Sequence, residues 1–421
     1  MSETLSPQTL SPQPWMKHPG TIAVVAALEA AGGPGCARFV GGCVRNALLR
    51  QPVDDIDIAT VLTPDEIIAA LRAAGLKAIP TGVEHGTVTA VAEGRPFEIT
   101  TLRRDVETDG RRAVVAFTTD WTEDAQRRDF RLNALYCEAD GTLHDPTGGG
   151  LADLRAGRIV FVGEAETRIR EDALRILRYF RFLAWYGKGE PDGVALTACQ
   201  ALRDLTASLS AERVSKELLK LLAAEDPRAS LSLMAKTGVL SVILPEAQGL
   251  ARFERLVAIE TGMLFTEDAE LRLASLLPDD PAVGLAVAQR LRLSNAQRDR
   301  LAAALGTEPK LVSWMSPRQA RQIIYRIGLQ PFLDRVTLAW AASDRLAATT
   351  QWRALLPLGQ SWPIPTFPLT GDEVAAAGVP RGPLMGAVMR EVEAWWVDND
   401  FIDDKLSIVE RLKAVAQGMV Y

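Results

Sequence analysis

The 421-residue sequence has few of the side chains that carry thiol, zinc or imidazole chemistry. It contains four cysteines and three histidines, and no two cysteines stand in the C-x-x-C spacing typical of zinc or redox sites. None of the histidines stands in a motif that would make it a general base. We therefore expect the cysteines to be reduced, mostly buried thiols of a cytoplasmic protein: Cys36, Cys43, Cys137 and Cys199.

The sequence also lacks an excess of positive charge and long apolar runs. Its formal net charge is −6, whereas a nucleic-acid-binding chain is usually basic, so any RNA contact must be a local patch. No apolar run is long enough to span a bilayer, and the N-terminus lacks the layout of a signal peptide. These absences favour a cytoplasmic protein without membrane contact. Residues 1–20, in which TLSPQ occurs twice, are expected to be a disordered leader.

What is present is a change of hydrophobic periodicity along the chain. Up to about residue 165, short runs typical of strands alternate with helical segments, and beyond it apolar residues recur every three or four positions. The expected fold class is therefore α+β, with a small mixed sheet followed by an all-α remainder. The charged segment 103–120 is expected to be a mobile loop. The expected strands lie at 36–40, 53–59, 86–92, 96–102, 132–138 and 158–162.

Asp55 and Asp57 are the sharpest candidates for chemistry. They stand two apart on the expected strand 53–59, so both side chains should point to one face and Asp54 to the other. Two such carboxylates repel each other unless a cation lies between them, and Mg²⁺ prefers oxygen ligands. An isolated D-x-D is usually a solvated pair. This one follows a strand–Gly-Gly–helix unit by 13 to 15 residues, which favours metal binding.

Two further features surround this pair. Gly41 and Gly42 would let backbone N–H groups approach a triphosphate at a helix N-terminus, and Arg45 could reach the same phosphates. Glu98 is a polar residue inside an otherwise apolar strand. It could be a third carboxylate of the metal site or an ion-pair partner for Arg45 or Arg103, and both roles stay open.

Seven motifs follow one another in order: GGCVRNALL, DDIDIAT, EITTLRRDVETDGR, RRDFRLNALY, DPTGGGLADL, RIREDALRILRYFRF and AERVSKELLKLL. Together they resemble the bacterial-type (class II) tRNA nucleotidyltransferase and poly(A) polymerase family, which has a polymerase β-like head. The resemblance is strong over residues 36–223 and thin beyond them. It implies a nucleotidyltransferase head at 21–155, a helical neck for nucleotide recognition at 156–240, and a helical tRNA-binding body and tail at 241–421.

The resemblance implies an enzyme that adds CCA to tRNA. The RNA 3′-hydroxyl would attack the α-phosphate of CTP or ATP, with Asp55 and Asp57 binding two Mg²⁺ ions. Rival activities are poly(A) polymerase, whose generic RNA substrate suggests a basic tail, and a CC- or A-adding specialist. A catalytically inert RNA-binding protein is a third rival. Retention of both aspartates and of segment 103–120 favours full CCA addition.

The resemblance also assigns residues to the sugar of the nucleotide. Arg128, Asp129 and Asn133 would form the pocket in which a ribose 2′-hydroxyl, both donor and acceptor, is required. Without the resemblance, an Arg–Asp structural ion pair is the alternative.

A second set is implied for the base. Asp172 and Arg175, three apart and so expected on one helical face, would read its Watson–Crick edge. Arg178 and Arg181 continue the same spacing. Arg178 is expected to contact the nucleotide and Arg181 the RNA phosphate; the alternative is that both are solvated. Glu212, Arg213 and Glu217 are expected to support the site from behind.

The sequence departs from the family pattern at three places near the site, of which Ala173, where a bulkier residue is frequent, is expected to have little consequence. Asn46 stands where the family usually has Asp, which puts in doubt a metal or hydrogen-bond role for this position. Arg131 replaces a small hydroxyl residue. With only three histidines, the HD phosphohydrolase domain of some relatives is expected to be absent.

In the helical part beyond residue 240, the expected tRNA contacts are arginines. Each of them could equally be an ordinary surface residue. The expected partners are tRNA, CTP and ATP, with no membrane, and the chain is expected to be a monomer or a homodimer. The candidate RNA contacts are Arg290, Arg292, Arg298, Arg300, Arg318 and Arg321.

Overall fold

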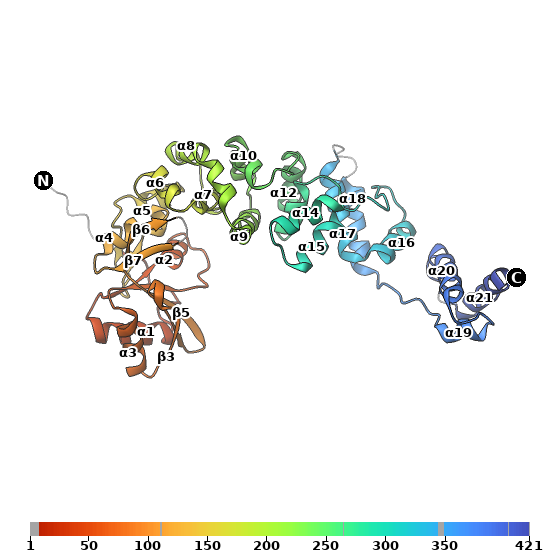
Figure 1. The fold of residues 1–421 in the computed structure, drawn as a ribbon, viewed down its shortest axis with the longest axis horizontal. Coiled ribbons are helices and arrows are strands. Elements are labelled where there is room, and N and C mark those ends of the chain that lie inside the picture. Colours follow the sequence, from red (N-terminus) through yellow and green to blue (C-terminus); the bar gives the residue numbers. More distant parts are fainter. Residues whose placement is uncertain (1–7, 110–111, 264, 344–348, 403, 421) are drawn as a thin grey trace. The chain divides into compact units, whose positions relative to one another are not determined.

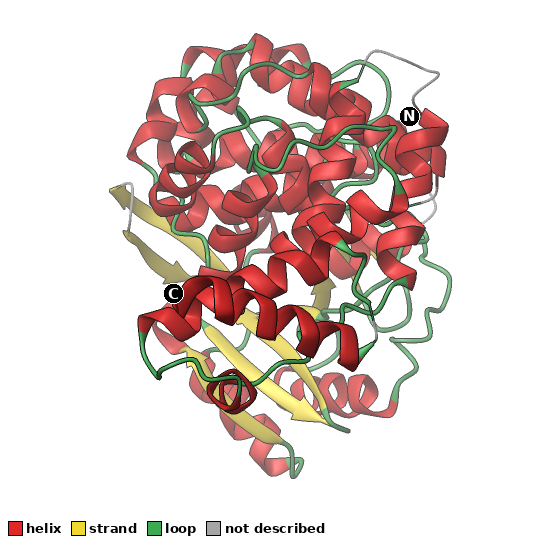
Figure 2. Cartoon of the chain, turned by 90° about the vertical axis from the view of Figure 1, so that its right-hand side faces the viewer, coloured by secondary structure: helices red, strands yellow, loops and turns green. Residues whose placement is uncertain are grey.

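The computed structural model describes residues 8–420 except 110–111, 264, 344–348 and 403. The chain folds as two compact units, Met1–Pro245 and Glu246–Tyr421 (Figure 1). The described strands belong to the first unit, and the described part of the second unit is helical. Figure 2 colours the helices red and the strands yellow. The expected α+β class with a small mixed sheet is confirmed. The regions expected as head and neck fall within one unit.

A seven-stranded mixed sheet forms the centre of the first unit. Its strand order is β3-β4-β5-β2-β1-β8-β9. β2 and β5 run parallel, and the other described pairs run antiparallel. Parallel neighbours need a crossover, which a helix and the β3–β4 hairpin supply between β2 and β5. The strands are β1 (Ala37–Val40), β2 (Asp57–Thr60), β3 (Lys77–Gly82), β4 (Thr87–Ala92), β5 (Arg95–Thr101), β8 (Tyr136–Cys137) and β9 (Leu143–His144).

Three helices pack near this sheet. They are α1 (Pro19–Gly32), α2 (Gly42–Leu48) and α3 (Pro64–Ala73), of which α1 and α3 contact each other and β4. α3 begins at a sequence-encoded cap, because the Thr63 hydroxyl accepts from the Glu66 backbone while the Glu66 side chain returns to Thr63. The start of α3 is therefore fixed by the residues of its own first turn.

Short helices lead from the sheet into the helical part of the first unit. α7 contacts both α9 and α10, and α9 buries an apolar stripe that includes Val214, Leu218 and Leu221. The elements are α4 (Trp121–Gln126), α5 (Gly150–Ala156), α6 (Ala165–Glu171), α7 (Leu174–Tyr186), α8 (Gly193–Ala201), α9 (Ala211–Leu222), α10 (Arg228–Lys236), α11 (Val239–Ile243) and the 3₁₀ turns η1 (Val83–His85), η2 (Arg131–Asn133) and η3 (Arg203–Ser208).

The expectation of a disordered leader over residues 1–20 is wrong for residues 8–20, and residues 1–7 lie outside the described part. Thr9 forms a bridge with Thr142, which follows β8. The Trp15 side chain is only 7% exposed and meets Phe39 edge-on, with ring centroids 4.8 Å apart. The repeated Ser-Pro-Gln composition gives no sign of this apolar anchor.

Segment 103–120 is also more regular than expected. β6 (Arg103–Asp109) and β7 (Arg112–Phe117) pair antiparallel as a separate two-stranded sheet. Its charged residues hid the alternation that marks a hairpin. Of the expected strand at 132–138, only β8, which follows η2, is a strand in the structure. The expected strand at 158–162 is represented by a single bridge between Phe130 and Phe161.

All four cysteines are buried and unpaired, as expected. Burial raises the pKa of the Cys43 thiol to about 11 and that of the Cys137 thiol to about 12. Such thiols are protonated at neutral pH and poor nucleophiles. They therefore serve packing.

The second unit contains two separate clusters of buried apolar side chains. One is centred on Phe332, Trp340 and Trp352, and the other on Val388, Val392 and Trp396. The Pro-rich stretch 362–368 separates the helices of the two clusters. The helices are α12 (Ala251–Met263), α13 (Ala269–Ser275), α14 (Pro281–Arg290), α15 (Asn295–Ala304), α16 (Pro317–Ile327), α17 (Leu329–Ala342), α18 (Thr349–Ser361), α19 (Gly371–Ala376), α20 (Pro383–Asp398) and α21 (Lys405–Val420).

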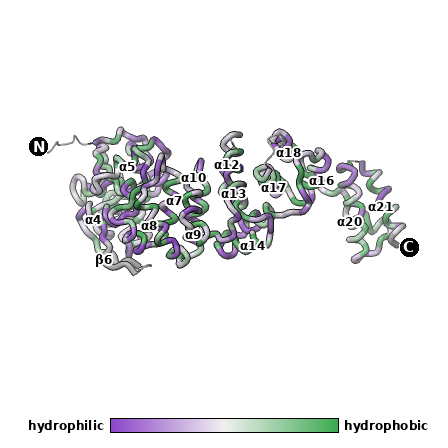
Figure 3. The backbone as a smooth tube through the Cα atoms, turned by 90° about the horizontal axis from the view of Figure 1, so that it is seen from above, coloured by the Kyte–Doolittle hydropathy of each residue, from purple (hydrophilic) through white to green (hydrophobic). Residues whose placement is uncertain are grey.

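Hydrophilic and hydrophobic residues are interspersed along the helices, as the colours of Figure 3 show. Within the described residues, no helix combines the length and the apolar character that crossing a membrane requires.

If residues 8–20 belong to the fold, Trp15→Ala should lower the free energy of unfolding by about 3–5 kcal/mol, the cost of removing a buried aromatic side chain. Ile22→Ala is the matched control, because Ile22 is an apolar residue of the same region but is 55% exposed. It should change stability by less than about 0.5 kcal/mol. Urea unfolding checks both, and equal small effects would show that Trp15 does not anchor the segment.

Candidate nucleotidyl-transfer site

The turn from β1 into α2 carries the two adjacent glycines. Gly41 has φ 69° and ψ −121°, a conformation that favours glycine. Gly42 has no such angle, and a Cβ added there would meet nothing closer than 3.8 Å. Neither backbone nor packing thus requires glycine at position 42. Its small size leaves space beside the start of α2.

Asp57 is the first residue of β2, and its position differs from the expected one. The strand begins at Asp57 rather than at residue 53, so Asp55 lies in the extended segment before it. Ile56 between them is only 5% exposed and points into the core. Because the side chain of Ile56 points into the core, those of Asp55 and Asp57 on either side of it do not. The alternation of side chains along a strand does not explain this, since Asp55 lies before β2.

Glu98 lies directly beside Asp57. The two residues are register partners in the parallel pair β2–β5, which puts their side chains on the same face. Burial, then the charges of Glu98 and Asp55, raise the pKa of Asp57 to about 6, against the opposing effect of Arg128 and Arg45. The carboxylates near Asp57 therefore raise its pKa more than the nearby arginines lower it.

Of the two roles open for Glu98, an ion pair with Arg45 does not form, since Arg45 has other partners. The Arg103 guanidinium donates to the His85 carbonyl at 2.6 Å. Across the described residues, however, no three His, Cys, Asp or Glu side chains converge closely enough to hold a metal ion. Asp55, Asp57 and Glu98 do not close into a three-carboxylate cage in this structure.

Arg45 is 8% exposed and hydrogen-bonded on all sides. Nη1 donates to Asn133 Oδ1 at 2.6 Å, Nη2 donates to the Tyr186 hydroxyl at 2.8 Å, and Nε and Nη2 both donate to Asn46 Oδ1. Its guanidinium also stacks 4.2 Å from the Tyr186 ring. Arg45 therefore links α2 to α7.

Asn46 has a defined role in that link. Its Oδ1 accepts from Arg45, and its Nδ2 donates to the Pro52 carbonyl at 2.9 Å, in the segment that leads to Asp55. A carboxylate could accept from Arg45 but could not donate to the carbonyl. The departure from the family pattern at position 46 thus fits a contact that an amide makes.

The expected sugar-pocket residues come together, with one addition. Asn133 Nδ2 donates to Asp129 Oδ1 at 2.9 Å, and Arg178 Nε donates to Asp129 Oδ2 at 2.8 Å. Burial favours the neutral acid, but Arg178 and then Asn133 outweigh it and lower the pKa of Asp129. Asp129 is thus ionised and connects the segment after α4 to α7.

Arg128 is held by a residue that the sequence reasoning missed. Asp124, on α4, accepts from Arg128 Nη2 at 3.0 Å, from Arg127 Nη2 at 2.7 Å and from the Tyr136 hydroxyl at 2.7 Å. Burial would raise the pKa of Asp124, but Arg128 and Arg127 outweigh it and hold it at about 2. Its spacing of three and four residues before the two arginines was the available signal.

The expectation for Asp172 and Arg175 is wrong in its geometry. Asp172 ends α6 with an extended backbone, and α7 begins only at Leu174, so the two residues do not share a helical face. The Asp172 carboxylate pairs with Arg213 Nη2 at 2.7 Å. Arg175 pairs with Glu171 and donates to the backbone carbonyls of Arg168 and Arg127.

Arg181, expected to face RNA, is instead occupied within the fold. Its Nε donates to Glu217 Oε2 at 2.6 Å, and its guanidinium lies 4.4 Å from the Phe182 ring. Glu217 is 5% exposed, so this ion pair is mostly shielded from solvent. Glu217 supports α7 from α9, as expected.

Several arginines of the second unit are likewise paired. Arg290 pairs with Glu246, Arg298 with Asp299, Arg321 with Asp400, and Arg300 with Asp268, Glu270 and Asp334. Arg292 and Arg318 are exposed. Two cavities of about 310 and 550 Å³ lie in this unit, and neither is lined by a residue singled out from the sequence.

Comparison with known proteins links this geometry to a family. Residues 37–160 match the family model described as the poly(A) polymerase head domain, and residues 192–250 match one described as a probable RNA- and SrmB-binding site of polymerase A. Over 389 residues the chain is 33% identical to the mitochondrial CCA tRNA nucleotidyltransferase 1 of Mus musculus, covering 89% of this chain and 86% of that protein.

Two bacterial proteins give the same result. The chain is 42% identical over 214 residues to the CCA-adding enzyme of Geobacillus thermodenitrificans, a match covering 50% of each chain. The crystal structure of the Bacillus stearothermophilus CCA-adding enzyme in complex with CTP superposes with a TM-score of 0.77 at 28% identity. That match covers 97% of this chain and 99% of that one. The likeness therefore extends beyond residue 223, further than the motifs reach.

Asp124→Asn should lower the free energy of unfolding by about 3–5 kcal/mol, because it leaves two largely buried guanidinium groups without their charge partner. The pKa of Asp124 is lowered from 3.8 to about 2, so the wild-type carboxylate contributes about 2 kcal/mol. That contribution is complete above pH 3.8 and is lost as the pH falls through 2.

Urea unfolding between pH 2 and 7 tests this, with Asp204→Asn as control because the Asp204 side chain is 82% exposed. A stability of Asp124→Asn equal to that of the control at pH 7 would contradict a structural role for the Asp124 ion pairs.

Proposed function

The chain belongs to the tRNA nucleotidyltransferase and poly(A) polymerase family, and on that premise we propose that it adds C, C and A to the 3′ end of tRNA. CTP and ATP would be the substrates, and no nucleic-acid template is needed. The observation that carries the proposal is the position of Asp57, beside Asp55 and Glu98 and next to the glycine turn that opens α2. The nearly full-length likeness to CCA-adding enzymes supports it.

The carboxylates fit a bound Mg²⁺ ion. They offer hard oxygen ligands, and burial, followed by the charges of Glu98 and Asp55, raises the pKa of Asp57. We propose that Asp55 and Asp57 are the protein ligands and that Glu98 acts from beside them. Bound Mg²⁺ would favour ionisation of the attacking hydroxyl and offset the charge of the triphosphate.

The residues around the carboxylates would position the nucleotide. Backbone N–H groups at Gly41 and Gly42 would approach the triphosphate, with Arg45 and Arg128 supplying positive charge nearby. Both arginines are fixed by neutral or anionic partners, so their orientation is set before the substrate binds. In phosphoryl transfer such positioning and charge stabilisation account for most of the catalysis.

Selection of a ribonucleotide is proposed to rest on Asp129 and Asn133. Their side chains are already hydrogen-bonded to each other, which fixes the donor and acceptor atoms that a 2′-hydroxyl would meet. Arg178 keeps Asp129 ionised from α7. We therefore assign Arg178 a positioning role behind the sugar.

Selection of the base is proposed to rest on Asp172 and Arg175. In the structure Asp172 is paired with Arg213 and Arg175 with Glu171. A base that replaced these partners would need a donor for Asp172 and an acceptor for Arg175, as the Watson–Crick edge of cytosine provides. Arg213 and Glu171 would thus hold the reading pair in place between cycles.

The proposed partners are tRNA, CTP and ATP, and the proposed location is the cytoplasm. Poly(A) polymerase remains the second candidate, because the head matches the model described by that name.

Incorporation into tRNAs ending before CCA, after C and after CC tests the function, with each nucleotide supplied alone and CTP together with ATP. Three added nucleotides followed by a stop are expected. An adenosine ladder on any RNA would indicate a poly(A) polymerase instead, and partial products would indicate a specialist.

In the same assay Asp57→Asn should reduce incorporation of both CMP and AMP by at least about tenfold to a hundredfold, because even residues behind a metal ligand contribute that range. Binding of tRNA should survive. Asp54→Asn is the control, since Asp54 is an exposed neighbour without a proposed ligand role. Near-normal rates for Asp57→Asn would overturn the metal assignment.

Arg175→Ala should blur the choice of base more than it slows the reaction. The expected change is a fall of about tenfold or more in the preference of kcat/KM for CTP over UTP, the loss of a hydrogen-bonded discriminating contact. Arg170→Ala is the control, as the Arg170 side chain is 60% exposed on the neighbouring helix. Unchanged selectivity for Arg175→Ala would remove this residue from base reading.

A further inference from the structure

The loop before α16 holds an exposed tryptophan between two anchored neighbours. Trp314 is 71% exposed and is the most exposed of the nine tryptophans. On one side Ser313 is buried and its hydroxyl donates to Gln351 Oε1 at 2.7 Å, and on the other Met315 belongs to the apolar cluster of Phe332. The backbone is thus fixed on both sides of Trp314, while its large apolar ring is left in solvent.

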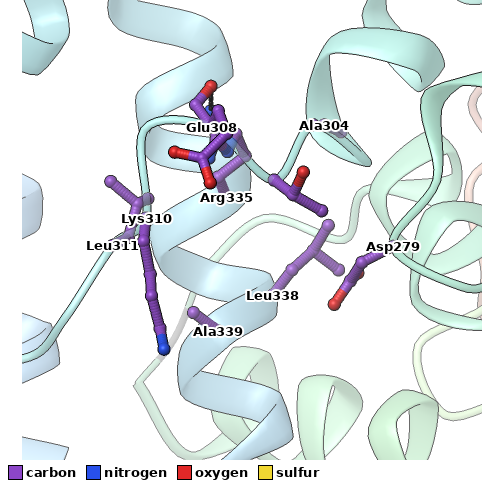
Figure 4. Close-up of a pocket in the computed structure, with 10 residues that line it drawn as sticks. Asp279, Ala304, Glu308, Lys310, Leu311, Arg335, Leu338 and Ala339 are labelled. Carbon is purple, nitrogen blue, oxygen red and sulfur yellow. Dashed lines mark hydrogen bonds between the residues drawn. The ribbon is translucent and has the colours of Figure 1, made fainter.

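Two exposed cations flank this ring in the sequence. Lys310 precedes Trp314 by four residues and Arg318 follows it by four. Figure 4 shows the Lys310 side chain extended, with its ammonium group turned away from the Glu308 carboxylate. In the part of the chain that the structure describes, neither cation forms an ion pair, whereas Arg321 on α16 is paired with Asp400.

The position of Arg318 has no explanation in the stability of α16. It lies in the first helical turn, which contains no acidic residue, and a cation there is disfavoured by the helix dipole. The exposed backbone N–H groups are already served by the capping box of Ser316 and Gln319. The side chain is therefore free to serve a negatively charged partner.

We propose that Trp314, Lys310 and Arg318 form an RNA-binding surface, on which an unpaired nucleotide stacks on the indole while its phosphates contact the two cations. An exposed aromatic ring beside cations is the combination by which proteins hold single-stranded nucleic acid. The carboxylates of an acidic protein segment would pair with the two cations, but they would not stack on the indole ring of Trp314. The surface rests on the proposed function, since it names where part of the tRNA binds.

The experiment uses the full-length protein and a tRNA that lacks its terminal CCA. Trp314→Ala should raise the KM and the Kd for this tRNA at least about fivefold, the lower end of what one base stack provides. The KM for CTP should stay unchanged. Trp314→Phe, which keeps an aromatic face, should restore most of the affinity. Arg318→Ala should weaken binding and flatten the dependence of log Kd on log salt concentration by about 0.7 to 0.9.

Two controls separate this surface from the general effects of substitution. Leu406→Ala removes an apolar side chain that is 76% exposed, and Arg381→Ala removes a cation whose side chain is 79% exposed but paired with Asp372. Both should leave tRNA affinity unchanged. If wild type incorporates nucleotides while Trp314→Ala and Arg318→Ala bind tRNA normally, the RNA surface is overturned and an acidic protein partner takes its place. A wild type without incorporation would overturn the proposed function itself.

Discussion

The buried carboxylate of Asp129 is the constraint on which the first unit depends. It accepts from Asn133 on one side and from Arg178 on the other, and Arg178 and Arg181 both lie within reach of Glu217. A charge in such a place is costly unless it is paired and fully hydrogen-bonded. The segment after α4 must therefore keep one position relative to α7. Arg45 on α2, hydrogen-bonded to both Asn133 and Tyr186, gives a second link to α7.

Charge is matched in one part of the site and unmatched in another. Asp124 and Asp129 are surrounded by arginines, and the pKa of each is lowered. Asp57 lies beside two further carboxylates, and burial together with their negative charge raises its pKa to about 6. The fold thus neutralises the acids that build the pocket and leaves the acid at the start of β2 short of positive charge. A positively charged ligand would therefore bind at Asp57. The ion pairs of Asp124 and Asp129 with arginines would keep the surrounding pocket rigid.

The sequence predicted those features of the site that depend on residue type and order. The glycine turn, the aspartates near the start of a strand and the Arg128–Asp129–Asn133 cluster lie together in the sheet unit, although their roles stay predictions. Features that depend on where an element ends were missed. A strand from residue 53 and a shared helical face for Asp172 and Arg175 both assumed regular structure across a boundary. The anchoring of Trp15 and the pairing of β6 with β7 depend on tertiary contacts and backbone pairing that local composition does not encode.

The number of arginines in the second unit does not predict how many can contact RNA, because several of them are paired within the fold. An arginine in an ion pair with its own chain has already used the charge that a phosphate would need, and displacing its partner exposes an acid to the phosphate. Arg290, Arg300 and Arg321 are in this position. With a net charge of −6, the chain has no general attraction for RNA. Recognition of a nucleic acid must then come from the few cations that the fold leaves unpaired, and from surfaces such as exposed aromatic rings whose attraction does not depend on charge.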